Sequence, residues 1–530
     1  MMKLLLILVL LAATREYDVN AANILVILPY PIYSHHASFD PIIKELATRG
    51  HNVTVVSPFP QKTPVPNITD IVLPNIMKEV RATTHRDELA MGTLWFHMFG
   101  AVEFGVEICR TALITDQMKQ LIADKDSKFD LVMTETWALL EPFVAFGHKF
   151  NAPVVNLISL FFMPKSSYSS GNQMPTSYVP DIVYFDFSDH MTFVERLQNM
   201  FFFYWDIFYA HVYYYRKQER LIREHFKYPG SENIPSLEEM LGNTALTISE
   251  YDFAVGYPAP LHKNVVLFAG VEMKKVEPLP EDLQKYMDES KGGVIYFSLG
   301  SIFGMASLKP YMKEAIISAL NKQNHRILMK ASNDSLLQKI TNKNIRIQSW
   351  FPQRSILAHP NCKLFITHGG IHGTMEGFYH GVPMIAIPLV GDQRYNAKMI
   401  QTHGLGISMN IHTITEKLLT DTINEVITNP KYRENARKRS AIFKDKPISP
   451  MDNAIYWIEY VIRHKGAPHL RPAVLDLYWY QRLMLDVIAF YLLLIFLIVY
   501  ILVKIIRLFF KLITWMCCSK VSKNKKSKKE

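Results

Sequence analysis

The sequence predicts an α/β protein with two parallel-sheet domains that face a cleft, followed by one C-terminal transmembrane helix. Two observations predict the paired domains. Strand-like β-branched runs alternate with helical stretches in residues 22–278, and the alternation restarts in residues 279–446 after Pro278 and Pro280. A third observation predicts the membrane helix, because residues 487–503 are apolar and carry no charge. A chain of 530 residues is also too long for one ordinary hydrophobic core.

An N-terminal leader precedes the first domain. Lys3 is followed by the apolar residues 4–13, and residues 19–21 offer a small-residue cleavage pattern. Residues 1–21 are therefore interpreted as a secretory signal peptide, whose apolar run is too short to span a membrane. The alternative, a buried N-terminal strand, is disfavoured because residues 24–28 already supply the first strand.

The two domains have the same kind of strand pattern. In the first domain, strands are expected at residues 24–28, 53–56, 131–133 and 154–158, with a helix around residues 39–49 that ends at Gly50. In the second domain, strands are expected at residues 294–297, 327–329, 364–367 and 384–387. Such open sheets bind ligands at the carboxyl ends of their strands, so the cleft between them is the predicted ligand site.

One stretch of the first domain is unusually aromatic. Residues 201–215 contain ten aromatic residues in fifteen. A pair of buried helices, an apolar acceptor pocket and a helix resting on a bilayer surface all fit this composition. The sequence does not choose among them.

The C-terminal end predicts the topology. Residues 447–486 are expected to form helices that pack back on the body and lead to the membrane helix. The tail, residues 504–530, holds nine basic residues and one acidic residue, and cationic residues prefer the cytosolic side. We therefore expect a single-pass type I protein of the endoplasmic reticulum membrane with a luminal body, residues 22–486. Lysines third and fifth from the end resemble a retrieval signal, and a solvated charge run is the alternative.

Composition excludes several classes of protein. The net charge is +10, but most of it belongs to the tail, so a nucleic-acid-binding body is not indicated. Four cysteines in the whole chain exclude a disulfide scaffold. In a luminal body the sequons at Asn52, Asn67 and Asn333 become candidate glycosylation sites. Asn67 lies in a Pro-flanked loop and is the best candidate, whereas Asn52 opens a strand and is expected to be more buried.

The second domain carries residues suited to a diphosphate. The strand at residues 364–367 leads into a turn that contains three glycines, Gly369, Gly370 and Gly373. Glycines let backbone N–H groups approach a phosphate closely, and a helix that begins near Thr374 directs its positive end to the same place. His368 can add a hydrogen bond to a phosphate oxygen.

Neighbouring side chains suit a nucleoside and a sugar. The carboxylate of Glu376 can accept hydrogen bonds from a ribose diol. Trp350 offers a flat face for a base, and the amide of Gln353 both donates and accepts. Asp392 and Gln393, at the end of the next strand, can bind sugar hydroxyls.

A metal site and a P-loop were weighed as alternatives. The spacing of His368, His372 and Glu376 suits zinc only if both histidines lie on one helical face, which the glycines between them disfavour. No Gly-Lys-Ser/Thr sequence ends the glycine turn, which argues against a P-loop. We therefore expect neither a metal nor another cofactor.

The run from Trp350 to Gln393 resembles the signature of the UDP-glycosyltransferases, the membrane-anchored animal family of UDP-glucuronosyltransferases and UDP-glucosyltransferases. Further matches are Phe297-Ser-Leu-Gly-Ser301, Arg49-Gly-His51 and Arg463-His-Lys-Gly466. The similarity covers essentially the whole chain. The sequence Gly391-Asp-Gln-Arg-Tyr-Asn396 is most similar to the arthropod branch.

This resemblance implies a GT-B enzyme with two Rossmann-like domains and the nucleotide sugar in the second. Trp350 and Gln353 would hold the uracil and ribose, and Glu376 the ribose hydroxyls. The diphosphate would be held by Ser301, His368, Gly373 and Thr374, and the sugar by Asp392 and Gln393. The family often has Asn where this chain has His372, which leaves the phosphate contact of that side chain in question.

The resemblance also implies a catalytic base in the first domain. The loop after the first strand reads Ser34-His35-His36, and the family's base is the His of a Ser-His pair sixteen residues before the Arg-Gly-His histidine. That spacing selects His35, with His36 a bystander. The carboxylate that orients the base is Asp in the family and Glu135 here, one methylene longer. Asp130 is interpreted as structural.

The implied reaction is an inverting, single-displacement transfer of a sugar from a UDP-sugar to a hydroxyl. The arthropod resemblance favours UDP-glucose, with UDP-glucuronate as the alternative. The expected acceptor is a small lipophilic alcohol or phenol, in detoxification or metabolite conjugation. Other classes are a non-catalytic GT-B protein that binds lipophiles or nucleotide sugars, and a ceramide or protein glycosyltransferase. Homo-oligomers of the anchored subunits are a family expectation.

Overall fold

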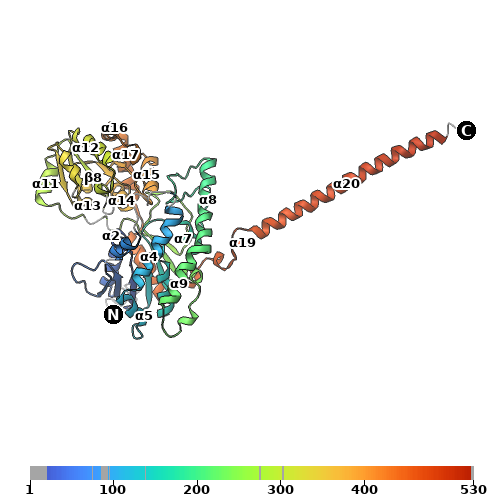
Figure 1. Cartoon of the computed structure of the whole chain (residues 1–530), viewed down its shortest axis with the longest axis horizontal. Coiled ribbons are helices and arrows are strands. Elements are labelled where there is room, and N and C mark those ends of the chain that lie inside the picture. The colour runs from blue at the N-terminus through green and yellow to red at the C-terminus, as the bar shows by residue number, and fades with distance from the viewer. Residues whose placement is uncertain are drawn as a thin grey trace, which may run out of the picture. The chain divides into compact units, whose positions relative to one another are not determined.

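The computed structural model describes residues 21–74, 76–84, 94, 96–137, 139–271, 273, 276–300, 304–332 and 334–526. The leader, residues 1–20, lies outside the described residues, as do the last four residues of the tail. The chain divides into a body, Met1–Arg471, and a C-terminal unit, Pro472–Glu530 (Figure 1).

The described strands of the body form two sheets in which every pairing is parallel. The first sheet has the order β3-β2-β1-β4-β5-β6-β7 and the second β10-β9-β8-β11-β12-β13. The first sheet consists of β1 (Asn23–Ile27), β2 (Asn52–Ser57), β3 (Ile68–Val72), β4 (Leu131–Thr134), β5 (Val154–Ile158), β6 (Leu246–Ser249) and β7 (Val265–Leu267). The second consists of β8 (Val294–Ser298), β9 (Arg326–Lys330), β10 (Ile345–Gln348), β11 (Cys362–Thr367), β12 (Met384–Ala386) and β13 (Gly406–Ser408).

Helices connect the strands and cover the sheets. Those of the first domain are α2 (Tyr33–Thr48), α3 (Ile76–Thr84), α4 (Ala101–Leu113), α5 (Asp116–Ala123), α6 (Ala145–Phe150), α7 (Pro164–Ser169), α8 (Phe193–Tyr209), α9 (Tyr215–His225) and α10 (Leu237–Gly242). Those that follow are α11 (Glu281–Asp288), α12 (Pro310–Asn321), α13 (Gln353–Ala358), α14 (Ile371–His380), α15 (Gln393–Thr402), α16 (Glu416–Thr428), α17 (Pro430–Lys444) and α18 (Pro450–Arg463). The C-terminal unit holds α19 (Trp479–Arg482) and α20 (Leu485–Lys526).

The predicted fold class is confirmed, and each of the eight predicted strands is present. The sequence pattern missed β3, β6, β7, β10 and β13. Four of these five, β3, β7, β10 and β13, are edge strands, and β3 and β10 have no buried residue. Short or half-exposed strands lack the continuous apolar run by which a central parallel strand is recognised.

The first helix starts earlier than predicted. We expected it around residues 39–49, but α2 begins at Tyr33 and continues through Pro41. Pro41 has no N–H to donate within the helix. The preceding turn gains a side-chain hydrogen bond instead, from Ser38 Oγ to the carbonyl of Ser34 (3.2 Å). As a result His35 lies in the first helical turn and not in a loop, which fixes its backbone.

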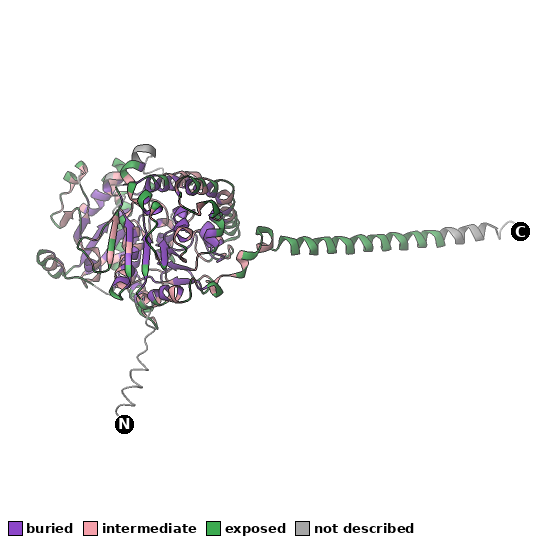
Figure 2. Cartoon of the chain, turned by 90° about the horizontal axis from the view of Figure 1, so that it is seen from below, coloured by how far each residue is buried: buried purple, intermediate pink, exposed green. Residues whose placement is uncertain are grey.

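The last helix of the body returns to the first domain. Ala454, Ile455 and Ile458 of α18 share one buried core with residues of β1 and β2. The Arg-Gly-His sequence lies at this contact, because Glu459 of α18 lies 3.7 Å from Arg49 Nη1 and 3.5 Å from His51 Nε2. Figure 2 shows the buried residues concentrated in the strands and the helix faces against them.

The aromatic stretch is divided between two environments. Phe203 and Ile207 of α8 and Tyr214 and Tyr215 after it are buried in the core of the first domain. Phe201 and Phe208 of the same helix are 55% and 57% exposed. The buried helix interpretation therefore holds for one face of α8 only.

The C-terminal unit contains a helix long and apolar enough to cross a membrane. Its apolar part, Leu485–Met516, has 32 residues and is exposed along its length (Figure 2). At about 1.5 Å per residue it spans roughly 48 Å, against a hydrocarbon core of about 30 Å. The predicted span, residues 487–503, was shorter because basic residues end the uncharged run, but they do not end the helix.

Two of the three sequons lie among the described residues. Asn67 is exposed, adopts a left-handed backbone conformation (φ 63°), and its side-chain amide donates to the carbonyl of Ala47 (3.1 Å). Asn52 begins β2 and is exposed as well, so the expectation that its strand position buries it is wrong. Asn333 lies outside the described residues.

Candidate active site

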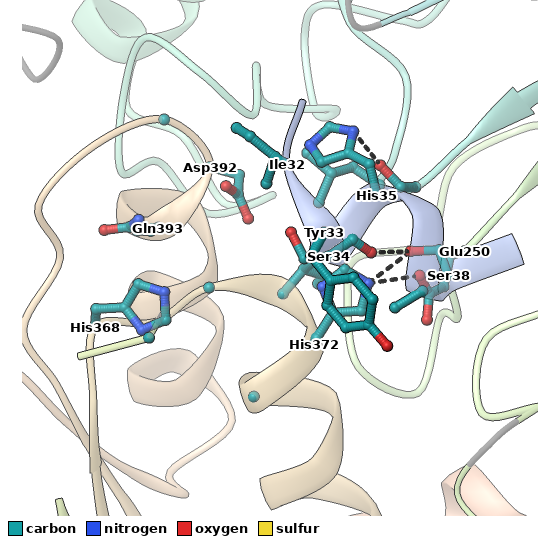
Figure 3. Close-up of a pocket in the computed structure, with 18 of the residues that line it drawn as sticks. Ile32, Tyr33, Ser34, His35, Ser38, Glu250, His368, His372, Asp392 and Gln393 are labelled. Atoms are coloured by element: carbon teal, nitrogen blue, oxygen red, sulfur yellow. Dashed lines mark hydrogen bonds and ion pairs between the residues drawn. The ribbon is translucent and has the colours of Figure 1, made fainter. Parts of the chain in front are cut away.

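A cavity of about 1690 Å³ lies between the two domains. Its walls are formed by loops at the carboxyl ends of the strands in both sheets, as expected for open α/β domains. One wall holds His35, Trp137 and Ser159 of the first domain, and the facing wall holds His368 and Glu376 of the second. Figure 3 shows His35 and His368 on opposite sides of the site.

The structure brings the two predicted catalytic residues into contact. His35 Nδ1 lies 2.9 Å from Glu135 Oε1. The same carboxylate oxygen accepts hydrogen bonds from Trp137 Nε1 (2.7 Å) and Ser159 Oγ (2.9 Å). Glu135 is fully buried, so its orientation is fixed. Because an ionised carboxylate only accepts, the proton lies on His35 Nδ1 and leaves Nε2 as a proton acceptor.

The extra methylene of Glu135 does not prevent this contact. Trp137 supports the imidazole directly, since the two rings stack with centroids 5.6 Å apart at 8°. Tyr30 packs on His35 as well, and burial together with the Glu135 charge raises the pKa of its phenol. His36 is buried away from this group, with Nδ1 3.1 Å from Ser57 Oγ, as expected of a bystander.

The glycines of the second domain make room for His368. The imidazole lies between the turns after β8 and β11. A Cβ placed on Gly300 would come within 2.7 Å of the His368 ring, and one placed on Gly370 within 2.6 Å. The space beside the ring therefore exists only because both positions lack side chains.

His368 is half-buried and neutral. Burial, with smaller effects from Lys330 and His372, lowers its pKa to about 4. Its Nδ1 atom is buried without a hydrogen-bond partner among the described residues. A buried polar atom without a partner is costly, and a ligand oxygen would satisfy it.

The N-terminus of α14 borders the cavity beside His368. Gly370 is the residue before the helix, and the amides of Ile371, His372 and Gly373 begin it. The first amides of a helix have no partner within it and favour an anion. Gly370, His372 and Gly373 all line the cavity, so this helix end can receive a diphosphate.

One of the predicted diphosphate ligands, Thr374, does not present its amide to this site. The backbone amide of Thr374 already donates to the carbonyl of Gly370 (3.0 Å), and its side chain is fully buried. That amide is therefore not available to a ligand in this arrangement. Ser301 lies outside the described residues.

The predicted nucleoside ligands lie together at one end of the cavity. Glu376 Oε2 accepts from Gln353 Nε2 (2.7 Å), and burial raises the pKa of the Glu376 carboxyl. Arg354 Nε lies 3.5 Å from Oε1 of the same carboxylate. Trp350 is 65% exposed, and the ammonium of Lys330 lies 4.5 Å from the centre of its ring.

The predicted sugar ligands lie at the start of α15. Asp392 Oδ2 accepts from Asn396 Nδ2 (2.5 Å), and burial raises the pKa of this carboxyl against opposing effects of His372 and His35. The amide oxygen of Gln393 accepts from the backbone of Leu389 (2.8 Å) and Val390 (3.0 Å). Asp392 lies on the side of the cavity that faces His35 (Figure 3).

His372 turns away from His368 and crosses to the first domain. Its Nε2 atom lies 3.0 Å from Glu250 Oε2 and 2.7 Å from Ser38 Oγ. The two histidines weighed as zinc ligands thus have separate surroundings. In the described part of the chain, no three His, Cys, Asp or Glu side chains form a group that could hold a metal ion.

Several residues of the site were not found from the sequence. Ser159, Glu250 and Lys330 each stand at or directly after the carboxyl end of a strand, where open sheets bind ligands, so strand position was a usable signal. Asn396, which holds both Asp392 and the carbonyl of Gly369 (2.9 Å), gave no comparable signal. Neither did Trp137.

Known proteins resemble this chain over most of its length. The family model "UDP-glucoronosyl and UDP-glucosyl transferase" matches residues 23–520. "UDP-glycosyltransferase UGT4" of Dactylopius coccus is 36% identical and aligns over 93% of this chain and 95% of its own. "UDP-glucuronosyltransferase 2B33" of Macaca mulatta is 32% identical, with 89% and 90% covered.

Solved structures share the fold at low sequence identity. The glycosyltransferase of kitacinnamycin matches with a TM-score of 0.56 at 15% identity, covering 84% of this chain and all of that one. A UDP-glucosyltransferase of Polygonum tinctorium matches with the same TM-score, 0.56, at 14% identity and the same coverage. The two facing parallel-sheet domains are thus the GT-B fold. With the family model, the relatives and the cavity in agreement, the chain belongs to the UDP-glucuronosyl and UDP-glucosyl transferase family and is a UDP-glycosyltransferase.

Proposed function

We propose that this enzyme transfers glucose from UDP-glucose to a hydroxyl group of a small lipophilic acceptor, with inversion at the anomeric carbon. One observation carries the proposal. A buried carboxylate orients an imidazole on one wall of the cavity, and the opposite wall presents a glycine-rich turn with the N-terminus of α14. The first wall suits activation of an alcohol and the second suits a departing diphosphate.

His35 acts as the base in this proposal. Its Nε2 takes the proton of the acceptor hydroxyl as the oxygen forms a bond to the anomeric carbon. Glu135 holds the proton on Nδ1 and stabilises the imidazolium that results. The bond between the anomeric carbon and the diphosphate oxygen breaks in the same step, so an α-linked donor yields a β-glycoside.

The second domain stabilises the leaving UDP. Negative charge collects on the diphosphate as the bond breaks, where the amides that begin α14 and the neutral imidazole of His368 can donate hydrogen bonds. We propose that these fixed dipoles serve in place of a metal ion. Trp350 and Gln353 would hold the uracil and ribose, Glu376 the ribose hydroxyls, and Asp392 and Gln393 the sugar.

The walls near His35 favour an apolar acceptor. Phe104, Trp137, Leu139 and Met163 all line the first-domain part of the cavity. Such a surface binds aromatic and aliphatic bodies by excluding water, while the hydroxyl must reach His35. Conjugation of a sugar would make such compounds more soluble, which fits detoxification or metabolite conjugation.

The choice of glucose rests on relatives. An insect relative at 33% identity bears the name "UDP-glucosyltransferase 2". Mammalian relatives named UDP-glucuronosyltransferases are 32–37% identical, so UDP-glucuronate is the second candidate donor. The sequence identities to these relatives therefore do not distinguish glucose from glucuronate as the donor sugar.

We further propose that Leu485–Met516 anchors the protein in the endoplasmic reticulum membrane with the body in the lumen. The exposed apolar length of α20 and the basic residues toward the C-terminus support this topology. Protease treatment of sealed microsomes should remove only the tail. Digestion of the body in intact vesicles would overturn the luminal placement.

A donor and acceptor screen tests the function. Full-length protein is incubated with radiolabelled UDP-glucose or UDP-glucuronate and a panel of phenols and alcohols. We expect β-glucoside products that disappear in His35→Ala while UDP binding remains. Unchanged turnover in His35→Ala would remove this residue from its role, and UDP binding without any product would favour the non-catalytic alternative.

A further inference from the structure

The side chain of His372 joins the two helices on which the reaction depends. It belongs to the first turn of α14, whose N-terminus borders the proposed diphosphate site. Its Nε2 contacts Ser38 Oγ at 2.7 Å, and Ser38 stands one turn after His35 on α2. The same atom contacts Glu250 Oε2 at 3.0 Å, at the carboxyl end of β6. Figure 3 shows these contacts between the walls of the cavity.

The partners of Nε2 show which atom carries the proton. Ser38 Oγ donates its own hydrogen to the carbonyl of Ser34 (3.2 Å), so toward His372 it can only accept. The carboxylate of Glu250 also only accepts. His372 Nε2 must therefore be the donor to both, and its hydrogen is shared between them.

The imidazole carries a positive charge at neutral pH. Burial lowers its pKa, but the Glu250 carboxylate, with smaller effects of Glu376 and Asp392, outweighs burial and raises the pKa to about 9. Nδ1 is then protonated as well. The side chain is 33% exposed and lines the cavity.

We propose that His372 is a positioning residue that couples occupation of the diphosphate site to the placement of the helix bearing the catalytic base. Its cation stands in the first turn of α14, beside the proposed diphosphate site, and its Nε2–H holds Glu250 and Ser38 of the first domain. Binding of UDP-sugar therefore fixes the spacing between His35 and the anomeric carbon. This inference rests on the proposed function. An Asn at this position could bind a phosphate but could not supply the cation for Glu250.

The coupling predicts a separation of binding from turnover. Glu250→Gln removes the charge that pairs with His372 but leaves His35 and the amides that begin α14 in place. We expect kcat to fall about 10-fold to 100-fold, because small misplacement of reacting groups has effects of that size. The dissociation constant of UDP should rise less than in His372→Asn, because the amides that begin α14 and the imidazole of His372 both remain. His372→Asn should lower both kcat and UDP affinity.

A double-mutant cycle tests whether the two residues act as one unit. If they do, kcat of the Glu250→Gln, His372→Asn double variant equals that of His372→Asn alone. The matched control is Tyr395→Phe, which removes another hydrogen bond between the domains, the 3.0 Å contact of Tyr395 with Tyr251. We expect this control to keep wild-type kcat, since neither residue lines the cavity.

The pH dependence supplies a signature that a merely structural contact would not give. The groups that act on His372 are Glu250 after β6, Glu376 on α14, Asp392 before α15 and the neutral His368 after β11. Loss of the imidazolium proton above about pH 9 should lower kcat of the wild type. This alkaline fall should move to lower pH in Glu250→Gln and vanish in His372→Asn.

Hydrogen exchange tests the coupling without turnover. UDP is added to the full-length protein, and exchange is followed by mass spectrometry in peptides that cover residues 33–38. We expect UDP to protect this turn of α2 in the wild type and in Tyr395→Phe, but not in Glu250→Gln or His372→Asn. Equal protection in all four proteins, or equal loss of kcat in the Tyr395→Phe control, would overturn the inference. If the protein shows no transferase activity, that result counts against the proposed function. The hydrogen-exchange measurement still tests the coupling, because it does not require turnover.

Discussion

Replacing Glu135 by Gln tests the carboxylate separately from its geometry. Oε1 of Glu135 accepts from His35, Trp137 and Ser159 at 2.7–2.9 Å. A Gln side chain with its oxygen in that place keeps all three donors and the tautomer of His35. The negative charge is lost, and the amide NH2 takes the place of Oε2, which is buried without a hydrogen-bond partner among the described residues. The variant therefore removes the electrostatic stabilisation of the imidazolium while it keeps the three donors.

The size of the effect follows from the distance. Two unit charges about 4 Å apart interact by about 4 kcal/mol at an effective dielectric constant of about 20. That is an upper value, since the charge on His35 is only partly developed in the transition state, and it corresponds to a fall in kcat of at most about 10³-fold. Single-turnover assays with UDP-glucose and a phenol measure the chemical step directly, and isothermal titration with UDP provides the binding control.

Two results would contradict this role of Glu135. We expect kcat to fall while UDP binds as before, because Glu135 lies on the first-domain wall. Wild-type kcat in Glu135→Gln would show that the carboxylate does not stabilise the base. A parallel loss of UDP binding would show that the substitution disturbs the whole cavity.

Three further predictions concern other buried groups. Glu376→Ala should weaken UDP binding about 10-fold or more, with little change in acceptor KM, because hydrogen bonds to charged groups contribute about 1.5–3 kcal/mol; equal weakening of both substrates in steady-state kinetics would contradict the ribose role. Gly370→Ala places a Cβ within 2.6 Å of the His368 ring, and such overpacking costs about 1–3 kcal/mol of folding free energy. We therefore expect a lower Tm and a weaker affinity for UDP in titrations. An unchanged UDP affinity would contradict the close approach of His368 to this turn. Burial raises the pKa of Glu141 from 4.5 to about 7, so the folded state holds a proton that the unfolded state releases, and stability falls by about 3 kcal/mol as pH rises between these values. Glu141→Gln should flatten that part of the Tm–pH curve, and an unaltered slope would exclude Glu141 as its source.

The fold was predictable wherever strands are buried on both faces. Residues of β1, β4 and β8 form nearly continuous apolar runs, because parallel strands covered by helices meet no solvent. The start of α2 was not predictable from periodicity. The sequence placed this helix around residues 39–49, and only the tertiary structure shows an earlier first turn supported by a serine side chain.

The candidate site was predictable where chemistry shows in residue type and spacing. His35, Glu135, His368 and Glu376 were selected from the sequence, and they line one cavity or contact its lining residues. Thr374 illustrates the limit, since its place after the glycine turn suggested a free amide that the helix itself uses. Contacts such as that of His372 with Glu250 join residues 122 positions apart, and no local pattern encodes them.

The chain passes between its two sheets twice, and the two passages touch. Lys446 Nζ, just after α17, donates to the carbonyl of Ala269 (3.0 Å), and a Cβ on the neighbouring Gly270 would lie 3.3 Å from the ring of Phe443. The two sheets are therefore joined by two adjacent segments of chain that contact each other, and not by a single linker.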